Sequence, residues 1–219
     1  MPYPMVHMVI AYKILEKSDR IKEPGDFILG SVAPDAVHFH NPYEVHRKEI
    51  SHLWDCGPRW GVTTESERWK SNICGFWEQH KKDDNRDFIA GYCVHILTDW
   101  MNDRTIWAPF RERILQGEDY DKVYAQSRYR EEGYGFDQWL NQTSSYTGEI
   151  WELLLRSRVY EVEGKILAED LMRQKQSILT EQFKQEIKYD IRNYHYCSQE
   201  AMTAYMAECV DTIEELIRL

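Results

Sequence analysis

Residues 91–100, GYCVHILTDW, read as a buried helix that carries two residues a buried helix normally avoids. His95 and Asp99 are four positions apart, so on a helix they lie one turn above each other, about 6 Å along the axis. Their side chains therefore project into the same space and can bind one ion together. The alternative is a core histidine that takes Asp99 as its hydrogen-bond partner.

The helical period extends outward from this stretch. Residues 84–107 form the longest apolar helical pattern, which predicts the central helix of the fold. Residues 4–18 and several long charged segments after residue 119 follow the same period, and no alternation of β-branched residues indicates a strand. We therefore predict an all-α fold, a single-domain bundle of long helices over residues 1–219, with the metal-ligand motifs concentrated in residues 1–105.

Two helix ends before the central helix are predicted from local signals. A helix over about 45–54 should be stopped by Gly57 and Pro58. The next helix should begin where Thr64 stands three positions before Glu67, because this is the spacing of a capping box.

Composition limits the classes of protein that the chain can be. At 219 residues, with 42% hydrophobic and 29% charged residues, it has the composition of an ordinary globular protein. No apolar run approaches the roughly 20 residues of a membrane span, and the N-terminal segment lacks a basic leader and a small-residue cleavage site. We therefore expect a cytoplasmic protein without a membrane span.

Charge and cysteine content narrow the choice further. The net charge of −10 disfavours attraction to DNA, RNA or anionic lipid, so no stable nucleic-acid complex is expected. The five cysteines are odd in number, scattered and without a C-x-x-C pair. Reduced thiols are therefore expected, rather than a disulfide framework or a zinc ribbon.

Further candidate ligands stand on separate apolar segments. His7 lies within the first predicted helix and His52 in KEISHLW, while Asp35 follows the Ala-Pro step of GSVAPD, where the proline should end a helical segment. Imidazole nitrogens and carboxylate oxygens that converge from different elements are what a zinc site needs. Burial of two aspartates without a cation would cost several kcal/mol each, and a divalent metal removes that cost.

The motifs of several other hydrolase classes are missing from the sequence. There is no H-E-x-x-H of a zinc protease, no adjacent His-Asp dipeptide, no P-loop and no G-x-S-x-G elbow. A metal site must therefore rest on the spacing of the residues named above.

Four segments in this order, HMVIAYKI, FILGSVAPDAVHF, KEISHLW and DFIAGYCVHILTDWMND, resemble the zinc-dependent phospholipase C family, a helical group that includes the P1 and S1 type nucleases. The resemblance covers about the first 110 residues. It implies a cluster of up to three zinc ions at the bottom of an interhelical cleft. By position, Asp35, His52, His95 and Asp99 would hold one zinc, and His7 with a bridging Asp99 would contribute to a second.

The chain departs from the family pattern after the central helix. Secreted members have a further histidine there, followed by a His-x-x-x-Glu or His-x-x-x-Asp pair, whereas this chain has only His195. Residues that could complete the site instead are His38, three positions after Asp35, and the less favoured His40, His46 and Cys56. Each of these has the alternative of an ordinary solvated or structural side chain.

The resemblance implies a hydrolase of a phosphoester that carries one or two zinc ions, or manganese or another divalent ion. The N-terminal segment and the acidic net charge add the expectation that it is intracellular and that its substrate is small. Metal-bound water would be the nucleophile, because zinc lowers the pKa of bound water from about 15.7 towards 7. Asp35 and Asp99 are the expected catalytic carboxylates, and Asp35 could orient the water or take its proton. The alternatives are a non-catalytic metal-stabilised helical scaffold and a partner-binding helical protein. The substrate and the oligomeric state cannot be predicted from the sequence.

Overall fold

The computed structural model describes residues 3–117, 122–184 and 189–219, and all regular structure in these ranges is helical. The prediction of an all-α fold is confirmed. Outside the helices, only isolated bridges join single pairs of described residues, Arg59 with Val62 and Val162 with Ile166. None of the described helices is both long and apolar enough to cross a bilayer.

Ten α-helices and four shorter helical segments follow one another along the described residues. The α-helices are α1 (Pro4–Lys17), α2 (Pro24–Gly30), α3 (Val45–Ser51), α4 (Ser66–His80), α5 (Arg86–Asn102), α6 (Ala108–Gln116), α7 (Lys122–Thr143), α8 (Thr147–Arg156), α9 (Ala168–Ser177) and α10 (Gln199–Ile217). Short 3₁₀ segments are η1 (Ala33–Phe39) and η4 (Ile191–Asn193), and π-helical segments are η2 (Asp103–Trp107) and η3 (Ile178–Gln182).

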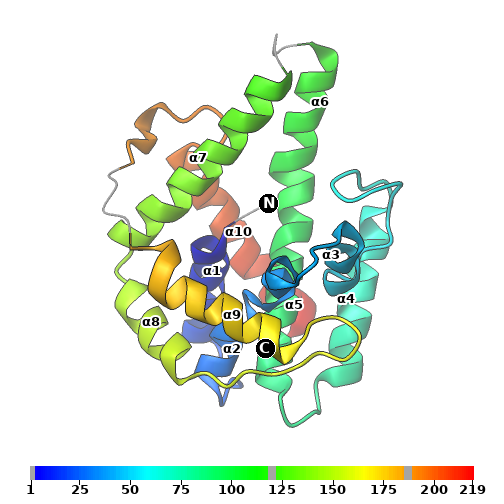
Figure 1. The fold of residues 1–219 in the computed structure, drawn as a ribbon, viewed down its shortest axis with the longest axis vertical. Coiled ribbons are helices and arrows are strands. Elements are labelled where there is room, and N and C mark those ends of the chain that lie inside the picture. Colours follow the sequence, from blue (N-terminus) through cyan, green and yellow to red (C-terminus); the bar gives the residue numbers. More distant parts are fainter. Residues whose placement is uncertain (1–2, 118–121, 185–188) are drawn as a thin grey trace.

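The helix α5 runs through the centre of the molecule, as the apolar pattern of residues 84–107 predicts. Every residue from Asp87 to Asn102 is buried, and α1, α2, α4 and α10 pack around it. The helical path continues through η2 into α6, and the three segments form one long rod (Figure 1). The predicted end of the central helix near Trp107 therefore falls inside this rod, where the hydrogen bonding changes from π back to α.

The helices α2 and α5 cross with their backbones in contact. A Cβ atom on Gly91 would lie 2.0 Å from the Phe27 carbonyl oxygen, and one on Gly30 would lie 2.1 Å from the Phe88 carbonyl oxygen. Only residues without a Cβ atom allow this approach. The crossing places the turn that follows α2 against the helix that carries His95.

The predicted stop of the helix over 45–54 is wrong in position. The helix α3 ends at Ser51, and Leu53 takes a left-handed backbone angle, with φ of 53°. This turns the chain before the Gly-Pro pair is reached. As a result, His52 stands at the C-terminal end of α3, where it is fully buried.

The capping box predicted for α4 is also wrong. The helix begins at Ser66, Glu65 occupies the cap position, and no side chain bonds the free backbone N–H groups there. The Thr64 hydroxyl instead donates to the Cys56 carbonyl oxygen at 3.3 Å, and the backbone N–H groups of Thr64 and Glu65 donate to the same oxygen. The Cys56 carbonyl oxygen therefore accepts the Thr64 backbone N–H that a capping box would pair with the Glu67 side chain.

The first helix is fixed at its N-terminal end by a buried carboxyl group. Asp137 of α7 is fully buried and accepts a hydrogen bond from the Val6 N–H at 2.9 Å. Burial raises the pKa of Asp137 from its ordinary value of 3.8 to about 8, against the opposing effect of the backbone donors. The carboxyl group is therefore protonated at neutral pH.

Replacement of Asp137 by asparagine keeps an acceptor for the Val6 N–H and removes this titration. Between pH 3.8 and about 8 the unfolded carboxyl has lost its proton and the folded one has kept it. The wild-type free energy of unfolding should therefore fall as pH rises through this range, by at most about 1.4 kcal/mol per pH unit. Asp137→Asn should lack this component. Urea unfolding from pH 5 to 9 measures the difference, and parallel curves for the two proteins would contradict the protonated state.

Gly91→Ala should destabilise the protein by about 2–3 kcal/mol, because the new Cβ atom forces two helix backbones apart. Gly75→Ala is the matched control, since Gly75 lies within α4 and a Cβ there meets nothing within 4 Å. That control should gain about 0.5–1 kcal/mol from helix propensity. Thermal and urea unfolding measure both values, and equal stability of the two variants would refute the account of the crossing.

Candidate metal centre

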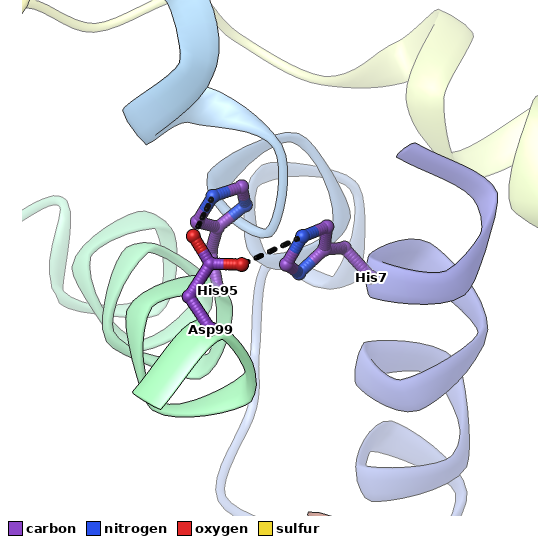
Figure 2. Close-up of side chains that lie close together, drawn as sticks. All are labelled: His7, His95 and Asp99. Carbon is purple, nitrogen blue, oxygen red and sulfur yellow. Dashed lines mark ion pairs between the residues drawn. The ribbon is translucent and has the colours of Figure 1, made fainter. Parts of the chain in front are cut away.

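Five of the predicted ligands meet at the junction of α1, η1, the end of α3 and α5. Figure 2 shows three of them, with the His7 side chain reaching from α1 toward Asp99 and His95 on α5. His52 arrives from the end of α3, and Asp35 from the first turn of η1. The helix α2 ends at Gly30, so Asp35 lies in a new helical segment rather than at the exit of the apolar one.

Two of the histidine rings are anchored by their outer nitrogens. Nδ1 of His95 lies 2.8 Å from the Ser31 carbonyl oxygen, and Nδ1 of His52 lies 3.0 Å from the Lys48 carbonyl oxygen. His95 Nδ1 faces a carbonyl and so donates its hydrogen to it, which leaves Nε2 as the atom with a free lone pair. His52 Nδ1 also lies 2.9 Å from the Ser51 hydroxyl, and its Nε2 has the free lone pair in the tautomer that donates to Lys48. Metal-binding histidines in proteins are held in this way. The two Nε2 atoms face each other at 3.3 Å.

The separations of the ligand atoms can be compared with those of a zinc site. His52 Nε2 lies 3.3 Å from Asp99 Oδ2 and 3.4 Å from Asp35 Oδ1. His95 Nε2 lies 3.8 Å from Asp99 Oδ2 and 4.0 Å from Asp35 Oδ2. Ligand atoms around a tetrahedral zinc with bonds of about 2.0–2.1 Å are about 3.3–3.4 Å apart. The pairs that include a histidine thus match or slightly exceed the spacing that one zinc ion requires, and Asp35, His52 and His95 together form one group of mutually close ligand atoms.

Two of the buried side chains have no hydrogen-bond partner among the described residues. Neither oxygen of Asp99 and neither ring nitrogen of His7 accepts or donates a hydrogen bond, although Asp99 is completely buried and His7 is 1% exposed. An unpartnered buried carboxylate costs several kcal/mol, so native proteins pair it with a cation or donors. The residues present therefore fit a metal ion.

The protonation states also suit metal binding. Burial opposes ionisation of Asp99, but the His52 ring together with His95 and His7 outweighs it and lowers its pKa to about 2. Burial, with the neighbouring His95, holds the pKa of His7 well below 6.5, and burial also lowers the pKa of His95. The aspartate is therefore ionised and these two imidazoles are neutral at pH 7, which are the forms that bind metals.

His7 lies on the far side of Asp99 from His52. Its ring stacks on that of His95 with centroids 3.8 Å apart and planes 12° apart, and its Nε2 lies 3.6 Å from Asp99 Oδ1. The oxygen that faces His52 is Oδ2. Two groups of three possible ligands result, His7 with His95 and Asp99, and Asp35 with His52 and His95, and they share His95. Both groups need the one free nitrogen of His95. If His95 binds the first ion, His7 and Asp99 Oδ1 remain as ligands for a second ion.

Lys48 was missed in the sequence, although it contacts this cluster directly. Its ammonium Nζ lies 2.8 Å from Asp35 Oδ1, and its side chain is 10% exposed. Burial raises the pKa of Asp35, but Lys48 together with His38 and His52 outweighs burial. The pKa of Asp35 is therefore held well below 3.8. The sequence signal that could have identified Lys48 is its spacing from His52. Lys48 precedes His52 by four positions and so lies one helical turn away on α3.

The other candidate ligands lie outside both groups. His38 Nε2 is 3.5 Å from Asp35 Oδ1, but its side chain is 42% exposed, and its role as a ligand stays a prediction. His40 pairs with Asp170 on α9, and His46 with the exposed Glu44. The Cys56 thiol donates to Asp55, and the His195 ring packs on Tyr196.

A cavity of about 720 Å³ adjoins the cluster and is lined by Asp35, His38 and Lys48 together with tryptophans from three segments, Trp54, Trp60, Trp69 and Trp107. Asn102 and Gln174 also line it, and their side-chain oxygens, Oδ1 and Oε1, are buried and have no partner among the described residues. Gln174 donates its amide N–H to the Val32 carbonyl oxygen at 2.8 Å, so its oxygen is the free end. These two oxygens are unpaired buried acceptors in residues of the cavity wall.

Comparisons of this chain with family models, with curated proteins and with solved structures find no match. The likeness to the zinc-dependent phospholipase C family therefore stays an expectation from the four sequence segments.

Zinc affinity should depend on the buried ligands and not on histidines in general. His52→Ala should weaken zinc binding at least about 100-fold, because a ligand to the ion is removed. His80→Ala is the matched control, since the exposed His80 pairs with Asp83 at 2.7 Å on the surface of α4. Elemental analysis and competition with a chelating dye measure the affinity. Equal zinc binding by both variants would exclude the cluster as the site.

Proposed function

We propose that this chain is a metal-dependent hydrolase of phosphoesters, with one zinc ion held by Asp35, His52, His95 and Asp99. The observation that carries the proposal is the completely buried Asp99 carboxylate, whose oxygens have no hydrogen-bond partner among the described residues while two anchored histidines face it. A cation resolves that conflict, and the adjoining cavity gives it access to a substrate. His7 contributes to a second position across Asp99.

The two carboxylates have different roles in this proposal. A bound zinc ion would supply hydroxide at neutral pH and polarise a phosphoryl oxygen. Asp99 is fully buried, so it holds the ligand set together and does not reach the substrate. The Asp35 side chain is 21% exposed and lines the cavity, where its carboxylate can orient a water molecule and accept its proton.

The cavity supports a small substrate that combines a phosphoryl group with a donor-bearing alcohol. Aromatic faces such as those of Trp54 and Trp60 can pack on the alcohol part. The free oxygens of Asn102 and Gln174 would accept hydrogen bonds from its hydroxyl or amine groups. The net charge of −10 disfavours a polyanion as the substrate.

A non-catalytic, metal-stabilised scaffold is the second candidate. The observation that favours it is that His52 Nε2 lies 3.3–3.4 Å from His95 Nε2, Asp99 Oδ2 and Asp35 Oδ1, which is the ligand spacing of a filled tetrahedral site, and structural zinc sites are closed by protein ligands in this way. This candidate predicts that metal removal lowers thermal stability and that the metallated protein turns over no phosphoester.

Zinc or manganese should support slow hydrolysis in a panel of phosphodiesters and phosphomonoesters at neutral pH, and chelation should abolish it. Asp99→Asn should lower kcat/KM more than about 100-fold, because it removes the charge that both metal positions would share. Asp83→Asn, in the exposed His80–Asp83 pair, should leave the rate unchanged. Inactivity of the folded, metallated wild type across the panel would favour the scaffold, and activity that survives Asp99→Asn would locate the chemistry elsewhere.

A further inference from the structure

The ammonium group of Lys48 is a fixed positive charge between the metal ligands and the cavity. Lys48 lies on α3 one turn before His52, its side chain is 10% exposed, and it lines the cavity beside Asp35. Burial opposes its charge, but the carboxylates of Asp35 and Asp99 outweigh that effect and raise its pKa. The group therefore remains an ammonium ion.

The contacts of Lys48 leave it able to bind a ligand. Its Nζ lies 2.8 Å from Asp35 Oδ1 and 3.2 Å from His38 Nε2, and it stands 5.3 Å from the centre of the Trp60 ring. An ammonium has three N–H donors, and among the described residues two of them have these acceptors. The third is available to an oxygen atom in the cavity.

We infer that Lys48 binds a non-bridging oxygen of the substrate's phosphoryl group. The inference rests on the proposed function, because a phosphoryl group beside Asp35 and His52 would lie next to this ammonium. A lysine is a point charge suited to phosphate oxygens, and it neutralises the negative charge that the phosphoryl group carries during transfer. It also gives an acidic chain a local positive field at the entrance to the site.

The alternative role for Lys48 is that of a counter-ion that only holds the Asp35 carboxylate in place. The two roles predict opposite effects on metal binding. If Lys48 positions a ligand, its removal weakens zinc binding. If it binds phosphate, its removal takes a positive charge away from beside a dication, so zinc should bind equally well or more tightly.

The test measures zinc and inorganic phosphate separately in Lys48→Met and Lys48→Arg. Calorimetric titration of the zinc-loaded protein with inorganic phosphate should show at least tenfold weaker binding for Lys48→Met, with zinc affinity unchanged or higher. Lys48→Arg should recover most of the phosphate affinity, because it keeps the charge. Lys70→Met is the matched control, since Lys70 also pairs with a carboxylate, Glu67, and stands 5.4 Å from a tryptophan ring, but is not part of the cavity wall.

Phosphate binding by Lys48→Met that equals the wild type, a loss of zinc together with phosphate, or no phosphate binding by the zinc-loaded wild type would each overturn the inference. If Lys48→Met fails to fold, Lys48→Gln replaces it, with thermal unfolding as the check. The outcome is separable from that of the proposed function. Phosphate binding that depends on Lys48 in a protein without turnover would support the inference and refute the hydrolase, whereas turnover with unchanged KM and kcat in the Lys48 variant would do the reverse.

Discussion

The burial of one carboxylate, that of Asp99, is the constraint around which the first half of the molecule is organised. It lies in the last turn of α5, completely enclosed, on a helix whose every residue from Asp87 to Asn102 is buried. A helix in that position normally presents only apolar side chains to its neighbours. Here α1, η1 and the end of α3 each contribute one polar side chain to the same cluster. The packing of these three elements is therefore coupled to the charges buried there.

The glycine contact between α2 and α5 makes that convergence possible. Since Gly30 and Gly91 let the two backbones touch, the turn after α2 lies directly against α5. That turn supplies the Ser31 carbonyl that fixes the His95 ring, and η1 begins there and carries Asp35 to the cluster. One backbone approach therefore positions both a group that orients a ligand and a ligand itself. The site depends on packing as much as on the identity of its residues.

The features that could be predicted from the sequence are those that depend on the helical repeat alone. The all-α class and the buried course of α5 follow from apolar spacing, and the pairing of His95 with Asp99 follows from their separation by four positions. What it could not recover depends on contacts between distant segments. The end of α3 is set by the backbone of Leu53, and Thr64 gives its hydroxyl to a loop carbonyl. The position of Lys48 beside Asp35 is likewise a tertiary contact, made between residues whose local patterns show no relation.

The walls of the cavity come from two parts of the chain that differ in what they contribute. The five converging polar groups all lie before residue 103, whereas Tyr129, Gln174 and Gln182 approach the same space from α7, α9 and η3. Substitutions in α7, α9 and η3 could therefore reshape part of the cavity wall and leave the five converging side chains unchanged.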